Sequence, residues 1–242
     1  MKKIYTIALF PLIAIIFSAS KPIDKSPVVL IFSKTNGYHH SSINVGIAAI
    51  KKLGESNGFL VDTTTDSLSF NKTNLEKYAA VIFLNPTLKV FGPEQEDAFK
   101  NYIQHGGGFV GIHSATDCEY NWAWYGSLVG AYFNGHPETQ QDAKIIVVDK
   151  NNPATRGMPD PWTIKDEWYN FRNLNPDVTV LIKIDESSYK GGTNGANHPM
   201  AWYHAFEGGR AFYTALGHRE ELYSDSIYLN LLKAGIQYAI GK

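Results

Sequence analysis

Short apolar runs recur along the first half of the chain. They lie at residues 28–32, 59–61, 79–84 and 109–112. Continuous apolar runs of this length are typical of strands that are buried on both faces of a sheet. The pattern therefore predicts four buried strands in this half.

Amphipathic segments lie between these runs. The first has Ile or Leu at helical spacing from Ile43 to Leu53, and it follows Ser41-Ser42, which can cap a helix N-terminus. The second begins at Pro93, a favoured first-turn residue, and can end at Gly106. Because strands and helices alternate, we expect a parallel sheet with right-handed crossovers.

The second half has a different pattern. Strand-like segments at residues 144–148, 178–184, 200–204 and 211–216 are separated by loops rich in Asn, Gly and Pro. Residues 205–210 have the composition of a hairpin connection, and residues 224–240 predict a final amphipathic helix. With no linker or repeat in between, we expect one domain over residues 27–242.

The first 20 residues have the pattern of a secretory signal peptide. Lys2 and Lys3 precede an apolar run over residues 4–17, and Ser18-Ala19-Ser20 offers small residues for cleavage. The run is short for a bilayer span, which makes an uncleaved anchor the weaker interpretation. We expect a mature chain that starts near Lys21, has no membrane attachment, and is periplasmic or secreted.

Composition narrows the classes of partner. The chain has 22 Lys and Arg against 23 Asp and Glu, a formal net charge of -1. This balance offers no obvious source for phosphate neutralisation, so we expect no nucleic-acid partner. The single Cys, Cys118, can form neither an intramolecular disulfide nor a Cys-rich zinc site, and we expect it to be buried.

Histidines follow several of the predicted strands. His39 and His40 come after the first strand, His113 after the fourth, and His218 after residues 211–216. Ligands bind parallel α/β sheets at the carboxyl ends of their strands. If residues 211–216 also run parallel, His40, His113 and His218 meet at one edge, which favours a functional site over three separate loop histidines.

The segment 106–115 has the form of a strand that runs into a sharp turn and presents His113. Nucleophile-elbow enzymes carry Ser or Cys at this position, so acyl-enzyme chemistry is not available there. Ser114 could be a nucleophile with His113 or His40 as base, but neighbours at an elbow point in different directions. We expect Ser114 and the nearby Asp117 to contribute to substrate binding.

Further candidates lie in the second half. Glu167 follows a Pro-rich aromatic stretch and is either a site acid beside apolar neighbours or a surface residue. Trp168 and Trp202 could stack on sugar rings, although aromatics are more often core. His136 and His198 each precede a Pro, and such histidines are as often structural as functional. The substrate-binding candidates are His39, Ser114, Asp117, Trp168, His198 and Trp202.

Two roles remain open for His40, His113 and His218. Catalytic zinc sites typically take three protein ligands, so the three imidazoles could bind a divalent metal such as Zn, with Glu167 as a fourth candidate. Alternatively, they act as acids and bases or only hydrogen-bond to substrate. A competent metal site needs ring nitrogens roughly 3 to 4 Å apart, and rings separated by more than about 8 Å would exclude it.

The chain resembles the ThuA-like (trehalose-utilisation protein) family, within the class I glutamine amidotransferase-like superfamily. The resemblance covers roughly residue 28 to the C-terminus and rests on residues 37–41, 107–115, 166–169, 198–202 and 208–218. It implies a flavodoxin-like three-layer α/β/α sandwich with a mainly parallel central sheet, and a link to carbohydrate catabolism. It implies no defined reaction. His113 stands where the superfamily has its nucleophilic Cys, so glutaminase activity is not carried over.

Two functional hypotheses follow, both with a small-molecule carbohydrate as partner. In the first, the protein is an exported enzyme, a hydrolase or lyase that acts on a glycoside or an oxidised (keto) sugar. Its catalytic groups are His40, His113, Glu167 and His218, because imidazoles titrate near neutral pH. In the second, it is a non-catalytic carbohydrate-binding module whose aromatic side chains stack on sugar and whose histidines only hydrogen-bond.

Overall fold

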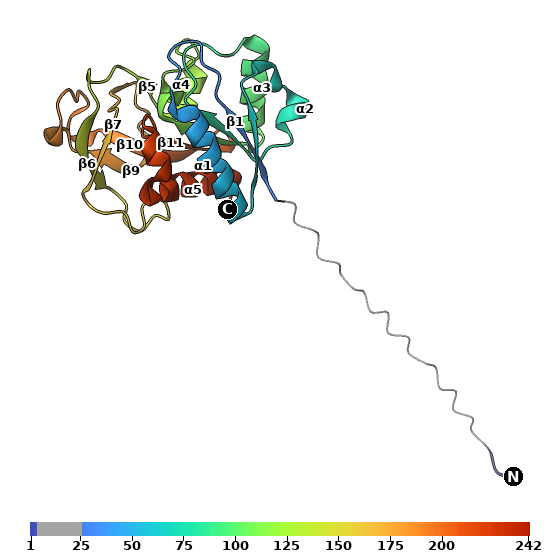
Figure 1. Cartoon of the computed structure of the whole chain (residues 1–242). Coiled ribbons are helices and arrows are strands. Elements are labelled where there is room, and N and C mark those ends of the chain that lie inside the picture. Colours follow the sequence, from blue (N-terminus) through green and yellow to red (C-terminus); the bar gives the residue numbers. More distant parts are fainter. Residues whose placement is uncertain (4–25) are drawn as a thin grey trace.

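A computed structural model of the chain describes residues 1–3 and 26–242 (Figure 1). The predicted signal peptide over residues 1–20 lies, from residue 4 onward, outside the described residues. Among the helices of the described part, none combines the length and the apolar character that a bilayer span requires.

Nine strands form one sheet in the order β2-β1-β3-β4-β11-β10-β9-β6-β7. The first five strands in this order are parallel, and each later neighbour is antiparallel to the one before it. The parallel strands are β1 (Val28–Phe32), β2 (Leu60–Thr64), β3 (Ala80–Leu84), β4 (Gly108–Ile112) and β11 (Gly209–Thr214). The antiparallel part contains β10 (Pro199–Phe206), β9 (Thr179–Ile184), β6 (Gln141–Val147) and β7 (Trp162–Asp166). A separate pair joins β5 (Tyr132–Phe133) to β8 (Phe171–Arg172).

Helices cover both faces of the sheet and give a three-layer α/β/α arrangement (Figure 1). On one face, α5 (Ser226–Ile240) contacts β3, β4 and β11, and it packs beside α1 (Ser42–Asn57). The other face carries α2 (Lys72–Leu75), α3 (Pro93–Gln104) and α4 (Ala123–Val129). The parallel part has the strand order of flavodoxin-like proteins, 2-1-3-4-5, which confirms the predicted fold class.

The hydrophobic core contains most of the apolar runs that predicted buried strands in the first half of the chain. All five residues of β3 and of β4 are buried, as their apolar sequences predict. The predicted burial of residues 59–61 on both faces is wrong, because β2 is an edge strand in which Leu60 is 59% exposed. Strands at the edge of a sheet have one unpaired side and keep solvent contact.

Three further details differ from the sequence-based expectations. Ser41 makes no side-chain capping bond, and Ser42 Oγ instead donates to the Gly217 carbonyl at 2.9 Å. The last helix is capped by Asp225, whose Oδ1 accepts from Ile227 N at 2.7 Å. Residues 162–166 form strand β7, which the sequence analysis did not predict because aromatic residues and prolines surround it.

The direction of each strand decides which residues meet at the functional edge. Strand β11 runs parallel to β4, as the histidine argument required. Four antiparallel pairings separate β11 from β7, so β7 runs in the same direction as the parallel strands. The carboxyl ends of β1, β4, β11 and β7 therefore all deliver their loops to one edge of the sheet.

Candidate functional site

Three histidines and one glutamate converge at this edge. They are His40, His113, Glu167 and His218, and each offers a ligand atom within 4.8 Å of those of the other three. His40 comes from the loop between β1 and α1, His113 directly follows β4, and His218 follows β11. Glu167 is the first residue after β7. We call these four residues the His/Glu cluster.

The distances within the His/Glu cluster are short. His218 Nδ1 lies 3.1 Å from Glu167 Oε2, and His113 Nε2 lies 3.4 Å from the same oxygen. The two ring nitrogens are 3.3 Å apart. The centroid of the His40 ring is 4.9 Å from that of His113 and 5.2 Å from that of His218. No pair of rings approaches the separation that would exclude a metal.

The backbone at His113 forces its side chain into the cluster. The residue has φ of 49°, in the left-handed region that non-glycine residues seldom adopt, and it is fully buried. Its Nδ1 atom lies 2.7 Å from the carbonyl oxygen of Ala215. A carbonyl can only accept, so Nδ1 carries the proton and Nε2 presents its lone pair to Glu167 and His218.

His40 is held in its neutral form. Burial, and then the neighbouring His113 and His218, lower the pKa of His40 to about 2. Its Nδ1 atom is buried and has no hydrogen-bond partner among the described residues. A neutral imidazole with an unpaired buried nitrogen is suited to bind a cation.

Glu167 and His218 form the charged part of the cluster. Burial acts to raise the pKa of Glu167, but the adjacent imidazoles of His113 and His218 outweigh it and hold that pKa far below its usual range. Burial acts to lower the pKa of His218, but the hydrogen bond and charge of Glu167 raise it above 6.5. The carboxylate is therefore ionised, and His218 gains a proton more readily than an isolated imidazole.

The His/Glu cluster fits a divalent cation of the zinc type. Nitrogen and oxygen atoms that bind Zn at about 2.0 to 2.1 Å in a tetrahedron lie roughly 3.4 Å from one another. The three distances among His113 Nε2, Glu167 Oε2 and His218 Nδ1 match this value, and His40 lies within 4.8 Å of them. Metal-binding histidines commonly donate their second ring N–H to a carbonyl, as His113 does to Ala215. The lone pairs of His113 Nε2 and Glu167 Oε2 face each other at 3.4 Å and repel, and a cation between them would remove that repulsion.

An open cavity of about 660 Å³ lies against three members of the cluster, and its volume suits a small-molecule ligand. Asp117, a substrate-binding candidate, lines this cavity. Tyr120 donates to Asp117 Oδ1 at 2.5 Å, and burial raises the pKa of this carboxyl. The remaining lining residues are Tyr38, His40, Phe133, His136, Glu138, Thr139, Gln140, Lys165, Glu167, Tyr169 and His218.

Two predicted substrate-binding tryptophans are not in this cavity. Trp168 is 1% exposed and its indole N–H donates to the Gln141 carbonyl at 2.8 Å. Trp202 is fully buried and donates to the Val129 carbonyl at 2.9 Å. Neither presents a ring face to a ligand, because both belong to the hydrophobic core. The expectation that they stack on sugar is corrected accordingly.

The other three substrate-binding candidates also lie outside the cavity lining. His198 is fully buried, with Nδ1 2.8 Å from Glu186 Oε1 and Nε2 2.8 Å from the Tyr169 carbonyl, so its role is structural. His39 is exposed and its Nδ1 contacts Thr35 Oγ1 at 3.1 Å. Ser114 is fully buried, and its hydroxyl has no partner among the described residues.

His136 is a rim residue that the sequence left undecided. Its Nε2 lies 3.5 Å from Glu167 Oε1, and its Nδ1 lies 2.7 Å from the Pro137 carbonyl. Lys165, in β7, also lines the cavity, two residues before Glu167. Strand alternation from Glu167 could have indicated Lys165, had β7 been recognised in the sequence.

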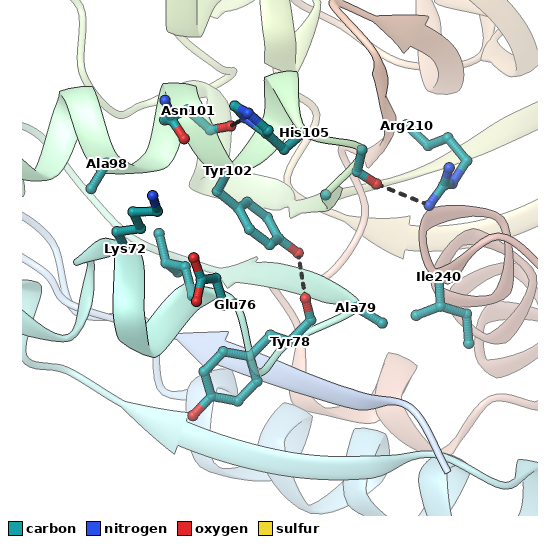
Figure 2. Close-up of a pocket in the computed structure, with 13 residues that line it drawn as sticks. Lys72, Glu76, Tyr78, Ala79, Ala98, Asn101, Tyr102, His105, Arg210 and Ile240 are labelled. Atoms are coloured by element: carbon teal, nitrogen blue, oxygen red, sulfur yellow. Dashed lines mark hydrogen bonds between the residues drawn. The ribbon is translucent and has the colours of Figure 1, made fainter. Parts of the chain in front are cut away.

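A second cavity, of about 470 Å³, lies at the opposite edge of the sheet (Figure 2). Its main polar groups already have partners: Tyr102 donates to the Tyr78 carbonyl at 3.2 Å, and Arg210 donates to the Gly106 carbonyl at 3.2 Å (Figure 2). His105, also in its lining, is bonded to the Asn101 carbonyl. The described residues of this cavity do not converge on a shared point, unlike the His/Glu cluster.

The elbow holds no reactive thiol. Cys118 is fully buried, five residues beyond His113, and burial raises the pKa of its thiol well above the usual value. A thiol must ionise to act as a nucleophile, so Cys118 is inert in this environment.

The fold and the cluster define a flavodoxin-like α/β protein with three histidines and a glutamate at the carboxyl ends of its strands. The family model described as trehalose utilisation matches residues 28–239, and the chain belongs to this ThuA family. The sequence comparison with curated proteins found no match.

Solved structures agree with this assignment. A putative ThuA-like protein from Bacteroides uniformis is 25% identical, with a TM-score of 0.76 over 93% of this chain and 96% of that one. One from Parabacteroides merdae is 20% identical, with a TM-score of 0.69 over 90% and 91% of the two chains. A beta-galactosidase from Bacillus circulans shares the fold at 13% identity, over 88% of this chain and 31% of its own, with a TM-score of 0.58.

Proposed function

We propose that the chain is a divalent-metal-dependent enzyme that acts on a glycoside or an oxidised (keto) sugar, as a hydrolase or a lyase. The observation that supports this most strongly is the His/Glu cluster, in which four potential ligands lie within 4.8 Å of one another beside an open cavity. The family description, trehalose utilisation, supports a carbohydrate as the ligand.

Different residues of the chain would bind the cation and the sugar. His40, His113, His218 and Glu167 would hold the cation, which when bound supplies a positive charge that polarises a sugar oxygen. Asp117 and Lys165 offer hydrogen bonds to sugar hydroxyls, and Tyr38 and Phe133 offer ring faces to the apolar side of a pyranose.

The proposed reaction excludes two alternatives by chemistry. Glutamine hydrolysis would need a thiolate at the elbow, where the chain has His113. A serine nucleophile at Ser114 would need an accessible hydroxyl, and this side chain is fully buried. Neither covalent route is therefore part of the proposal.

The test is a turnover assay on a panel of glycosides and keto-glycosides, before and after removal of metal by a chelator. We expect activity that is lost with the metal, restored by one divalent ion, and absent in His113→Ala. His105→Ala is the matched control, because His105 lies at the opposite edge of the sheet. Turnover that survives both chelation and His113→Ala contradicts the proposal. Saturable sugar binding without any turnover supports the carbohydrate-binding module instead.

Export belongs to the same proposal. A basic start, an apolar run and small residues before Lys21 support delivery of the mature domain to the periplasm or the medium. Its substrate would then be a sugar that is encountered outside the cytoplasm.

A further inference from the structure

The two backbone N–H groups on either side of His218 bind the same carboxylate. Gly217 N donates to Asp166 Oδ2 at 2.9 Å, and Arg219 N donates to Asp166 Oδ1 at 3.2 Å. We propose that Asp166 is a positioning residue that fixes the His218 imidazole against Glu167. This inference rests on the proposed metal-dependent function and extends it to a residue outside the His/Glu cluster.

Two adjacent carboxylates at the end of β7 have different tasks. Asp166, the last residue of β7, binds the backbone at Gly217 and Arg219, whereas Glu167, the next residue, contacts the His218 ring. Asp166 is fully buried, whereas Glu167 reaches the cavity and lies 3.1 Å from His218 Nδ1. Because the two residues are neighbours in the chain, the bonds that Asp166 makes to the His218 loop also set the distance between Glu167 and His218.

The peptide before His218 is held from its other side as well. The Gly217 carbonyl accepts from Ser42 Oγ at 2.9 Å, Asn85 Nδ2 at 3.4 Å and Tyr223 OH at 3.3 Å. Ser42 is the first residue of α1, which follows β1, and Asn85 follows β3. Segments that follow two neighbouring strands, β1 and β3, therefore both bind this peptide. The His218 backbone is therefore bound on both sides before any ligand arrives.

The chemistry of Asp166 makes it hard to replace. Each of its oxygens accepts from a different backbone N–H, so both oxygens are used as acceptors. An Asn at this position keeps the shape but has only one acceptor, and its NH2 group would face a backbone N–H. One of the two amides beside His218 would then lose its partner, at a cost that favours movement of the loop.

Two measurements on the full mature chain test the inference. In the metal-free protein, long-range proton–nitrogen NMR of the histidine rings reports whether His218 Nδ1 keeps its hydrogen bond to Glu167. Titration with Co²⁺ then reports affinity and, through its visible spectrum, the ligand geometry. We expect Asp166→Asn to lose the His218 hydrogen-bond signature and to weaken Co²⁺ binding by about 10- to 100-fold.

The control is Asp185→Asn, because Asp185 also binds backbone, at Ser187 N, without lining the cavity. It should change neither readout. If Asp166→Asn does not fold, as judged by circular dichroism, Ser42→Ala releases the same peptide from its other side and should shift both readouts in the same direction by less.

The positioning role of Asp166 and the proposed metal function can fail independently in these measurements. A folded Asp166→Asn variant with unchanged His218 signals and unchanged Co²⁺ affinity overturns the positioning role. A wild-type chain that binds no Co²⁺, while Asp166→Asn still displaces His218 in the spectra, contradicts the metal function and supports the positioning role.

Discussion

His113 Nδ1 lies 2.7 Å from the Ala215 carbonyl oxygen, which joins the end of β4 to the end of β11. This bond fixes the tautomer of His113 and points the other ring nitrogen at Glu167 and His218. A ring held in this way is already oriented before a ligand binds, so little conformational entropy is lost when a cation is coordinated.

Removal of the His113 ring should therefore have two effects. His113→Ala should abolish stoichiometric metal binding, and it should lower the free energy of unfolding by about 1 to 3 kcal/mol because the buried Ala215 carbonyl loses its donor. Metal analysis and urea denaturation measure the two effects. His105→Ala, at an exposed site, should leave both unchanged. A His113→Ala variant that keeps one tightly bound ion would contradict this role.

Metal affinity should depend on pH through His218. The pKa of His218 is raised above 6.5, and a metal binds only the deprotonated ring, so protons compete with the ion as the pH falls through that pKa. The contribution of His218 to affinity should fall by about tenfold per pH unit below it. His40 should add nothing in this range, because its pKa is lowered to about 2. Co²⁺ titrations between pH 5.5 and 8.5 measure the trend, and affinity that rises toward acid would contradict it.

The chain should release no ammonia from glutamine. The thiolate that splits the amide in glutaminases is missing from the elbow, and the Cys118 thiol is buried with its pKa raised. Cys118→Ser should leave sugar turnover unchanged. Ammonia release that disappears in Cys118→Ser would show that this interpretation of the elbow is wrong.

Gly217 should tolerate no side chain. Its φ is 123°, and a Cβ there would lie 2.6 Å from the Tyr228 hydroxyl and 2.8 Å from the Tyr223 hydroxyl. Gly217→Ala should lower the free energy of unfolding by more than about 1 kcal/mol and weaken metal binding through the displaced His218. Gly157→Ala, also at positive φ but with nothing within 4 Å, should cost less and leave metal binding intact. Equal effects of the two substitutions would count against a close fit at Gly217.

The exported protein should start near Lys21. We expect cleavage after Ser18-Ala19-Ser20, which would remove the basic and apolar segments that precede the domain. Intact mass spectrometry of the protein from the periplasm or medium of an expressing bacterium measures the start. A product that begins at Met1 would contradict export by this route.

The sequence predicted those residues of the site that follow strands of the parallel part of the sheet. His40, His113 and His218 each follow a strand of the parallel part, and the rule that ligands bind at carboxyl ends placed them together. Apolar runs indicated the strands, whereas the parallel direction of residues 211–216 was a condition of the prediction, and the structure meets that condition. Glu167 was paired with them as a candidate carboxylate, but its strand was not recognised.

The features that the sequence did not predict depend on tertiary packing, for which a single sequence carries no local pattern. Two prolines, Pro159 and Pro161, come just before β7, and the strand begins with Trp162. The segment therefore has no recognisable strand pattern. Trp168 and Trp202 have the composition of a sugar platform, and only the packing of the antiparallel strands shows that they are core. The bond of His198 to Glu186 likewise has no local signal, because it joins two residues 12 positions apart in the segment between β9 and β10.

The central claim is that the His/Glu cluster binds one divalent cation, and an optical Co²⁺ titration of the mature chain tests it most directly. We predict one ion per chain with the intense visible bands of tetrahedral nitrogen and oxygen coordination, retained in His105→Ala and lost in His113→Ala. Absence of those bands in the wild-type chain, or the same bands in folded His113→Ala, would contradict the claim.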